Sequence, residues 1–250
     1  MPKGSLPRLI AIPHSKKGLR VSDWTILCDF DGTIAFDDVI DKLLQRHGRT
    51  GWEKLERDWR AGRIGSRECM REQVALLDMS PEQFHACLES CQIDPAFAPF
   101  VEMAREHSIP LRVVSDGLDY AIRTMLVRDG VEDLPVAGNH LRRVGARRWQ
   151  LDSPFRAGNC RSGTCKCACV RQAGISGSHT LLIGDGASDF CAAEEVDFVF
   201  AKHRLIDHCE SNGLAYQPIQ DFRDVLALMP RLLAGEFDPA AVALPMVAQS

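Results

Sequence analysis

The chain has 250 residues, with 30 Lys and Arg against 34 Asp and Glu, and a formal net charge of -4. This balance gives no reason to expect a nucleic acid or a membrane surface as a partner. No apolar run approaches the roughly 20 residues that cross a bilayer, and the length suits one large core or a core with a small inserted domain.

Residues 1–22 form a basic arm before the first predicted strand. Their apolar stretch, Leu9–Ile12, is shorter than the roughly 7–15 residues of a signal-peptide core, so we expect a cytoplasmic protein. In the cytoplasm, the ten cysteines are expected to be reduced thiols, metal ligands or core residues rather than disulfides. Residues 237–250, rich in Ala and Pro, predict a poorly constrained tail.

The first predicted strand covers residues 24–29 and runs into Asp29-Phe30-Asp31-Gly32-Thr33. Side chains two residues apart on a strand point to the same face, and Gly32 permits a sharp departure into the next loop. One carboxylate would attack a substrate while the other transfers a proton. Taken alone, the pattern also fits an ordinary turn, because Asp and Gly are common turn residues.

Residues 37–94 predict a helical insert that interrupts the α/β pattern. Helices are expected within 53–59 and 66–77. A further helix is expected after Ser80, where Pro81 and Gln83 complete a capping-box pattern.

Three later apolar strands alternate with helices, which predicts a parallel sheet. They cover residues 111–114, 180–183 and 197–200. The tips of the first, second and third of the four predicted strands should converge on one crevice, because ligands bind at the carboxyl ends of parallel strands. Residues 135–163 are expected to form a short hairpin or an irregular excursion at the sheet edge.

Two more carboxylates, Asp185 and Asp189, follow the third of these four strands. Magnesium prefers oxygen ligands and often uses one or two carboxylates beside water, although Asp189 also fits a favourable charge in a first helical turn. Lys166 precedes that strand. A lysine is more often a solvated surface charge, but the position of Lys166 before a strand tip makes it a candidate site residue.

In combination, these features resemble the motifs of the haloacid dehalogenase superfamily, over residues 24–222. The matching residues are Asp29-Phe30-Asp31-Gly32-Thr33, Ser115, Lys166, and Gly184-Asp185 with Asp189. The insert after the first motif is similar to the C1 cap of phosphoserine-phosphatase-like members. The resemblance implies an α/β fold with a Rossmann-like parallel sheet core flanked by helices (residues 23–36 and 95–236) and an inserted α-helical C1 cap (residues 37–94).

The resemblance also implies a magnesium-dependent phosphatase that works through an aspartyl-phosphate. Asp29 would be the nucleophile and Asp31 the general acid and base. Magnesium would be held by Asp29, the Asp31 backbone carbonyl and Asp185, with Asp189 orienting its ligands. The phosphate would be bound by Ser115, Asp116, Gly117 and Lys166.

The implied substrate is a small phosphorylated metabolite, and Asp38, just beyond the first motif, is the candidate for specificity. The residues around Cys28–Ile34, Gly163–Cys165 and Ile183–Asp185 resemble a methionine-salvage branch of the family. The chain departs from that branch at Asp116, where a small residue is expected, and in a shorter cysteine-rich loop. A phosphoserine- or phosphocholine-like ester and a catalytically silent regulatory homologue are the alternatives; a homodimer is left open.

The densest group of cysteines is Cys160, Cys165, Cys167 and Cys169, which flanks Lys166. Structural zinc sites usually pair their cysteines with two to four residues between them, a spacing that this group lacks. Reduced packing cysteines, a zinc site and a disulfide therefore all stay open. If the group is redox-active, oxidation there is expected to alter activity.

Overall fold

The computed structural model describes residues 24–174 and 179–237 of the chain. The predicted arm of residues 1–22 lies outside them, and so does the predicted tail apart from Phe237. Within the described ranges, no helix has both the length and the apolar character needed to cross a membrane.

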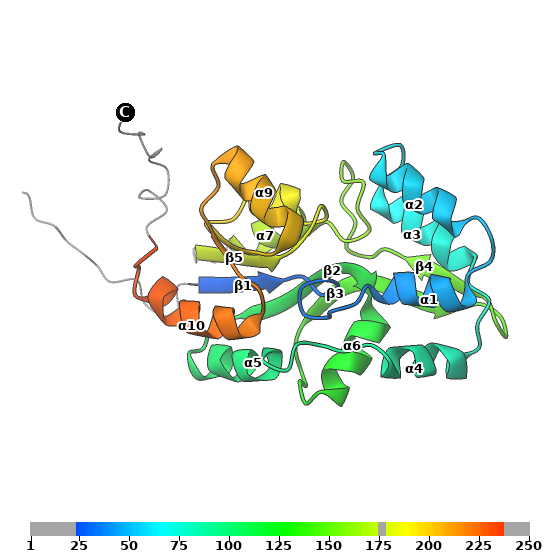
Figure 1. Cartoon of the computed structure of the whole chain (residues 1–250), viewed down its shortest axis with the longest axis horizontal. Helices are drawn as coiled ribbons and strands as arrows, with labels where there is room; N and C mark the ends of the chain where they lie inside the picture. Colours follow the sequence, from blue (N-terminus) through cyan, green and yellow to red (C-terminus); the bar gives the residue numbers. More distant parts are fainter. Residues whose placement is uncertain (1–23, 175–178, 238–250) are drawn as a thin grey trace, which may run out of the picture.

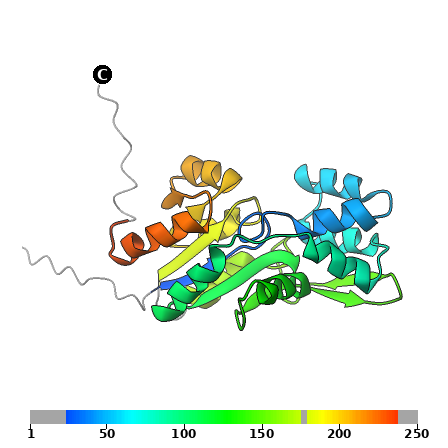
Figure 2. The ribbon, with the colours of Figure 1, turned by 60° about the horizontal axis from the view of Figure 1, so that its bottom comes forward.

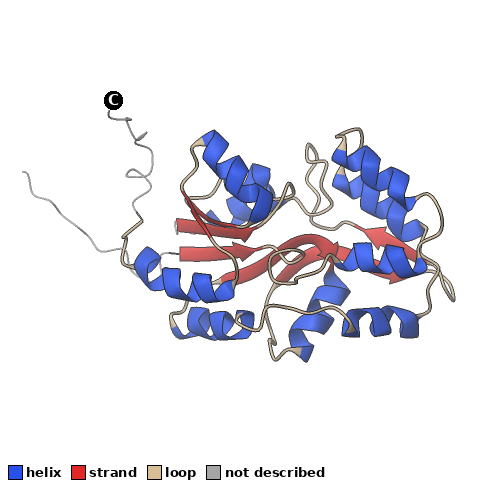
Figure 3. Cartoon of the chain, in the orientation of Figure 1, coloured by secondary structure: helices blue, strands red, loops and turns tan. Residues whose placement is uncertain are grey.

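A seven-stranded sheet forms the centre of the described structure, in the order β4-β3-β2-β1-β5-β6-β7. Neighbouring strands are parallel, except that β3 and β4 are antiparallel. Figure 3 shows the strands surrounded by helices. The strands are β1 (Trp24–Cys28), β2 (Leu111–Leu118), β3 (Val136–Arg143), β4 (Trp149–Asp152), β5 (His179–Gly184), β6 (Phe198–Ala201) and β7 (Tyr216–Pro218).

The helices divide between the two faces of the sheet and one of its ends (Figure 1). The first seven in chain order are α1 (Val39–His47), α2 (Trp52–Arg60), α3 (Ser66–Ala75), α4 (Pro81–Glu89), α5 (Phe97–Glu106), α6 (Asp119–Arg128) and α7 (Lys166–Gly174). The others are α8 (Phe190–Ala193), α9 (His203–Asn212) and α10 (Phe222–Leu233).

Strand β1 shows how alternation builds a core on each face of the sheet. Ile26 and Cys28 join a cluster with residues of α5, α6 and α10, whereas Leu27 joins a second cluster with residues of α7, α8 and α9. Both faces are covered, so the central strands are mostly apolar, as expected for a parallel sheet. The predicted α/β fold with a Rossmann-like sheet is confirmed.

Helices α1 to α4 gather at one end of the sheet, beyond the carboxyl ends of the central strands (Figure 2). The predicted capping box is present, because Ser80 and Gln83 bond each other's backbone N–H groups at the start of α4. These helices fall within the stretch predicted as a cap, and the division into cap and core stays a prediction.

The predicted excursion after residue 135 is a hairpin of β3 and β4 at the sheet edge. Its first strand also pairs with β2 in the parallel sheet, starting at Val136 opposite Val113. The tip reaches the helices of residues 37–94: Trp149 Nε1 donates to the carbonyl of Met79 at 2.9 Å, and Arg147 bonds Asp78.

Candidate active site

The ends of β1, β2 and β5 meet around one pocket. Cys28 lies opposite Val113 of β2 and Ile183 of β5, so the residues that follow these strands come together. The chain runs from β1 outward to β4 and then returns to β5, which makes the gap between β1 and β5 the switch point where such sheets bind ligands. The cavity has a volume of about 180 Å³.

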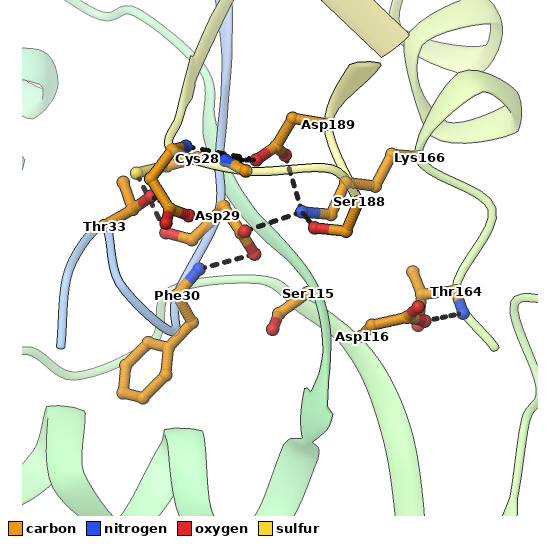
Figure 4. A network of polar contacts seen from close by, with 12 residues as sticks. Cys28, Asp29, Phe30, Thr33, Ser115, Asp116, Thr164, Lys166, Ser188 and Asp189 are labelled. Carbon is orange, nitrogen blue, oxygen red and sulfur yellow. Dashed lines mark hydrogen bonds and ion pairs between the residues drawn. The ribbon is translucent and has the colours of Figure 1, made fainter. Parts of the chain in front are cut away.

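Asp29 leaves the end of β1 with its carboxylate buried. Its Oδ1 accepts a hydrogen bond from the backbone N–H of Phe30 at 2.8 Å, and its Oδ2 lies 2.8 Å from Lys166 Nζ (Figure 4). Burial and the neighbouring charge of Asp189 raise the pKa of Asp29, while Lys166 opposes this rise. The carboxylate is thus placed at the pocket with a cation on one oxygen.

Asp31 lines the same pocket, two residues further along. Its Oδ1 accepts a hydrogen bond from the N–H of Val39 at 3.1 Å, at the start of α1. Burial raises the pKa of Asp31 to about 6, although the Val39 N–H and Lys166 favour the charged form. A carboxyl group that titrates near neutral pH is suited to give and take a proton.

Gly117 makes room for Asp31. A Cβ at this position would overlap Asp31 Oδ2 and would lie 3.0 Å from Ser115 Oγ. The neighbouring Ser115 is buried, and its hydroxyl accepts a hydrogen bond from the N–H of Gly117 at 2.9 Å. The end of β2 therefore brings a residue without a side chain close to Asp31 and adds the Ser115 hydroxyl to the same pocket.

Lys166 is the first residue of α7, and its side chain is 1% exposed. Its Nζ lies 2.8 Å from Asp29, 2.6 Å from Asp189 and 3.0 Å from Ser188 Oγ. Burial alone would lower the pKa of Lys166, but the two carboxylates outweigh burial and raise it, so the side chain is a cation. It links the first and last motifs directly.

Asp189 is bonded by the protein through both of its oxygens. One oxygen pairs with Lys166, and the other accepts hydrogen bonds from the N–H groups of Asp185 and Gly186 at 3.1 and 3.2 Å. The carboxylate of Asp185 is less committed, since the one described hydrogen bond to it comes from the Thr33 hydroxyl at 3.3 Å. These contacts suit Asp189 to a positioning role and leave Asp185 with free lone pairs.

Ligand oxygens of Asp29, Asp185 and Asp189 all lie within 4.8 Å of one another. Oxygen donors of this kind are those that magnesium prefers. Three carboxylates share a single lysine here, so a bound divalent cation would balance the excess negative charge. Gly32 allows this closeness, because a Cβ there would lie 2.5 Å from Asp185 Oδ2. The residues therefore fit a magnesium ion.

The Asp116 carboxylate, predicted among the phosphate-binding residues, bridges two other segments. It accepts hydrogen bonds from the Thr164 N–H at 2.6 Å and from the Ser66 hydroxyl at 2.5 Å. The first bond fixes the loop before Lys166, and the second fixes the start of α3. Phosphate binding by Asp116 would therefore come from its backbone N–H.

The outer half of the pocket is lined by residues of α1, α2 and α3 and by Asp38. Asp38, the predicted specificity residue, caps α1 by accepting a hydrogen bond from the N–H of Asp41 at 3.1 Å. No Lys or Arg is among the described residues that line the cavity. The lining from this half comprises Asp38, Ile40, Asp41, Glu56, Trp59, Ser66, Cys69, Met70 and Gln73.

Several residues that line the site or support it carry no recognisable pattern in the sequence. Ser66 and Thr164 hold Asp116, and the buried Lys202 donates to the carbonyl of Thr33 at 3.2 Å, which steadies the loop after β1. Asp41 and Glu56 enter the pocket only because the helices fold over it. No local motif marks these positions, whereas the acidic residues that follow β1 and β5 form short patterns.

The sequence profile of the haloacid dehalogenase-like hydrolase family matches residues 26–194. A 2-hydroxy-3-keto-5-methylthiopentenyl-1-phosphate phosphatase of Geobacillus thermodenitrificans is 28% identical over 212 residues, 83% of this chain and 96% of its own length. A polyol phosphate phosphatase of Saccharomyces cerevisiae is 28% identical over 228 residues, which cover 84% and 94% of the two chains.

Among solved structures, substrate-bound phosphoserine phosphatase aligns with a TM-score of 0.64 at 17% identity, over 82% of this chain and 97% of that one. A phospho-aspartyl intermediate analogue of phosphoserine phosphatase gives the same TM-score at 18% identity, over 82% and 98%. At this level of identity, the likeness concerns the fold.

Proposed function

The chain is a phosphatase of the haloacid dehalogenase-like hydrolase family, and we propose that it uses magnesium and an aspartyl-phosphate intermediate to hydrolyse a small-metabolite phosphomonoester. The observation that carries this proposal is the buried Asp29, held at 2.8 Å by Lys166 in the pocket that Asp31 also lines. A fold alone does not require this set of groups, which argues against a silent homologue.

In the first step, an oxygen of Asp29 attacks phosphorus, and the bond from phosphorus to the leaving oxygen breaks. Asp31 gives its proton to that oxygen, so the alcohol departs neutral. Asp31, now a carboxylate, then takes a proton from water as the water oxygen attacks the phosphorus of the aspartyl-phosphate. The bond to Asp29 breaks, and inorganic phosphate and the original carboxylate remain.

The phosphoryl oxygens need positive charge and hydrogen-bond donors during both steps. Lys166, the Ser115 hydroxyl and the backbone N–H groups beside it would supply them. Bound magnesium, held by the Asp29 carboxylate, the Asp31 carbonyl and Asp185, would reduce the repulsion between the anionic nucleophile and the anionic phosphate. Asp189 would keep Lys166 and the Asp185 loop in place through its contacts with both.

For the substrate, we propose 2-hydroxy-3-keto-5-methylthiopentenyl-1-phosphate. The Geobacillus relative that carries this name covers 83% of the chain. Ile40, Trp59 and Met70 line the outer pocket, and their apolar and sulfur-containing side chains would pack against a methylthio group. The lining of the outer pocket bears only on the leaving group of the substrate, because the chemistry at the phosphate is the same for every substrate.

A phosphocholine-like ester is the second candidate, favoured by the charge of the outer pocket. Asp38, Asp41 and Glu56 line it beside Trp59, and no lysine or arginine is among its described lining residues. A quaternary ammonium would be attracted by the carboxylates and by the aromatic face. The carboxylate of phosphoserine would meet the same acids without a partner, so phosphoserine is the less suitable of the two amine-bearing esters.

A kinetic comparison separates these candidates. The purified protein with magnesium is assayed for phosphate release from the methylthiopentenyl ester, phosphocholine, phosphoserine and glycerol phosphate. We expect the highest kcat/KM for the methylthiopentenyl ester. A higher value for phosphocholine, together with a selective loss of that activity in Glu56→Gln, would assign the second candidate. Absence of hydrolysis for all four esters, and for p-nitrophenyl phosphate assayed as a general substrate, would contradict the reaction class.

A further inference from the structure

A second pocket, separate from the catalytic one, is lined by four cysteines. Cys160, Cys165 and Cys167 belong to the cluster seen in the sequence, and Cys191 joins them from α8. Cys169, the remaining member of the sequence cluster, does not line this pocket. The cavity has a volume of about 460 Å³ and opens at the surface. The phosphatase chemistry uses none of these thiols.

Two of the four sulfur atoms are already in contact. The Sγ atoms of Cys167 and Cys191 lie 2.8 Å apart, although the two residues are 24 positions apart in the sequence. The ion pair between Arg171 and Glu195, at 2.6 Å, joins the same two segments one helical turn further along. A disulfide bond of about 2.05 Å would therefore need only a small shift of the two side chains.

The two thiols differ in their access to solvent. Cys191 is exposed, whereas Cys167 is 8% exposed. An oxidant dissolved in water would reach Cys191 first, and Cys167 is the thiol in position to react next.

Metal binding is the other chemistry that a cysteine cluster offers. Among the described residues, the group of three or more ligands with atoms mutually within 4.8 Å is Asp29, Asp185 and Asp189, and the cysteines form no such group. The contact between two sulfurs thus favours dithiol chemistry over a structural zinc site.

We propose that Cys191 and Cys167 form a reversible, peroxide-reactive thiol pair. The Cys191 thiolate attacks a hydroperoxide oxygen, the O–O bond breaks, and Cys191 becomes a sulfenic acid while water or an alcohol is released. The Cys167 sulfur then attacks the Cys191 sulfur, and the S–O bond breaks with release of water. The two thiols lose two electrons in total to the peroxide, and a low-molecular-weight thiol reverses the reaction by exchange.

The position of the pair gives it a consequence for the catalytic site. Cys167 directly follows Lys166, and Cys191 lies two residues after Asp189. A disulfide would therefore fasten together the two segments whose side chains form the buried Lys166–Asp189 ion pair. Because the sulfurs start in contact, the bond preserves that ion pair, and the resolving thiol protects Cys191 from irreversible oxidation.

Peptide mapping of the full-length protein after hydrogen peroxide treatment tests the proposal. We expect a peptide pair joined through Cys167 and Cys191, two fewer titratable thiols than the ten of the reduced protein, and full reversal by dithiothreitol. In Cys167→Ser, Cys191 lacks its resolving partner and gains two or three oxygen atoms that dithiothreitol does not remove. Cys160→Ser, a matched change in the same pocket, still forms the bridge.

The buried pair of Cys87 on α4 and Cys91 just beyond the end of that helix serves as an internal control and should stay reduced in the same digest. A bridge between Cys160 and Cys165, or irreversible oxidation of Cys191 in the unmodified protein, would overturn the proposal. The mapping reads the chemistry of the thiols, so it stands whatever substrate the phosphatase acts on. If Cys167→Ser does not fold, the presence or absence of the Cys167–Cys191 bridge in the peptide map of the unmodified protein decides the proposal.

Discussion

Replacing Lys166 by Met removes the one cation that the described structure places among the catalytic carboxylates. The aliphatic part of the side chain is kept, so the change concerns charge. Lys166 makes ion pairs at 2.8 and 2.6 Å with its own side chain only 1% exposed. Breaking a buried pair from one side costs about 3–5 kcal/mol, because the partner carboxylates stay buried without compensation.

The loss of stability should depend on pH. In the intact protein the pKa values of Asp29 and Asp185 are raised above 3.8, mainly by burial. The contribution of such an acid to the stability of the folded state is fully present below its unfolded pKa and is lost as the pH rises through the folded pKa. Without Lys166 both pKa values rise further. The loss in free energy of unfolding caused by Lys166→Met is therefore largest near neutral pH and smaller at about pH 5.

Urea unfolding measures this deficit, with magnesium absent and at both pH values. Lys42→Met is the matched control, because Lys42 pairs with Asp37 at 2.6 Å near the surface, where such pairs contribute no more than about 1 kcal/mol. Added magnesium should restore part of the stability of Lys166→Met by binding the folded state. A loss equal to that of Lys42→Met, or one that is the same at both pH values, would refute the reasoning.

Asp31→Asn should slow phosphoenzyme formation from an alkyl phosphate by about 10²–10⁴-fold and affect p-nitrophenyl phosphate less, because p-nitrophenolate leaves without a proton; equal losses in stopped-flow assays would exclude the acid role. In the unmodified enzyme, that step with an alkyl phosphate should slow as the pH rises above about 6, since Asp31 then loses its proton. Gly117→Ala should lower kcat, because its Cβ overlaps Asp31, whereas Gly158→Ala, which meets nothing within 4 Å, should leave kcat unchanged. Asp116→Ala leaves the Thr164 N–H and the Ser66 hydroxyl without their partner and should raise KM in initial-rate assays. EDTA should abolish turnover and magnesium should restore it, and full activity in EDTA would contradict the metal assignment.

The sequence predicted β1, β2, β5 and β6, and the polar residues at the tips of the first three of them, because both are local signals; β7 was not predicted. The short apolar runs that end in Asp29, Ser115 and Asp185 each carry the strand and the polar residue in one stretch of chain. Strand β3 was harder to recognise. Its burial changes from fully buried over Val136–Asn139 to mostly exposed afterwards, because it belongs first to the sheet and then to the edge hairpin.

The rest of the site depends on tertiary packing that no local pattern encodes. Ser66 and Thr164 meet Asp116 only because α3 and the loop before Lys166 fold against the end of β2. For the same reason, the sequence did not indicate that Cys191 belongs with the other cysteines, since it contacts Cys167 from a separate helix.

The central claim, that Asp29 forms a covalent aspartyl-phosphate, is tested most directly by trapping the enzyme during turnover. The protein is mixed with substrate and magnesium, quenched in acid within milliseconds and digested for peptide mass mapping. The account predicts a phosphoryl group on Asp29 in the peptide that spans the end of β1, and none in Asp29→Asn, which should also be inactive. A phosphoryl group on a different residue, or wild-type activity in Asp29→Asn, would contradict it.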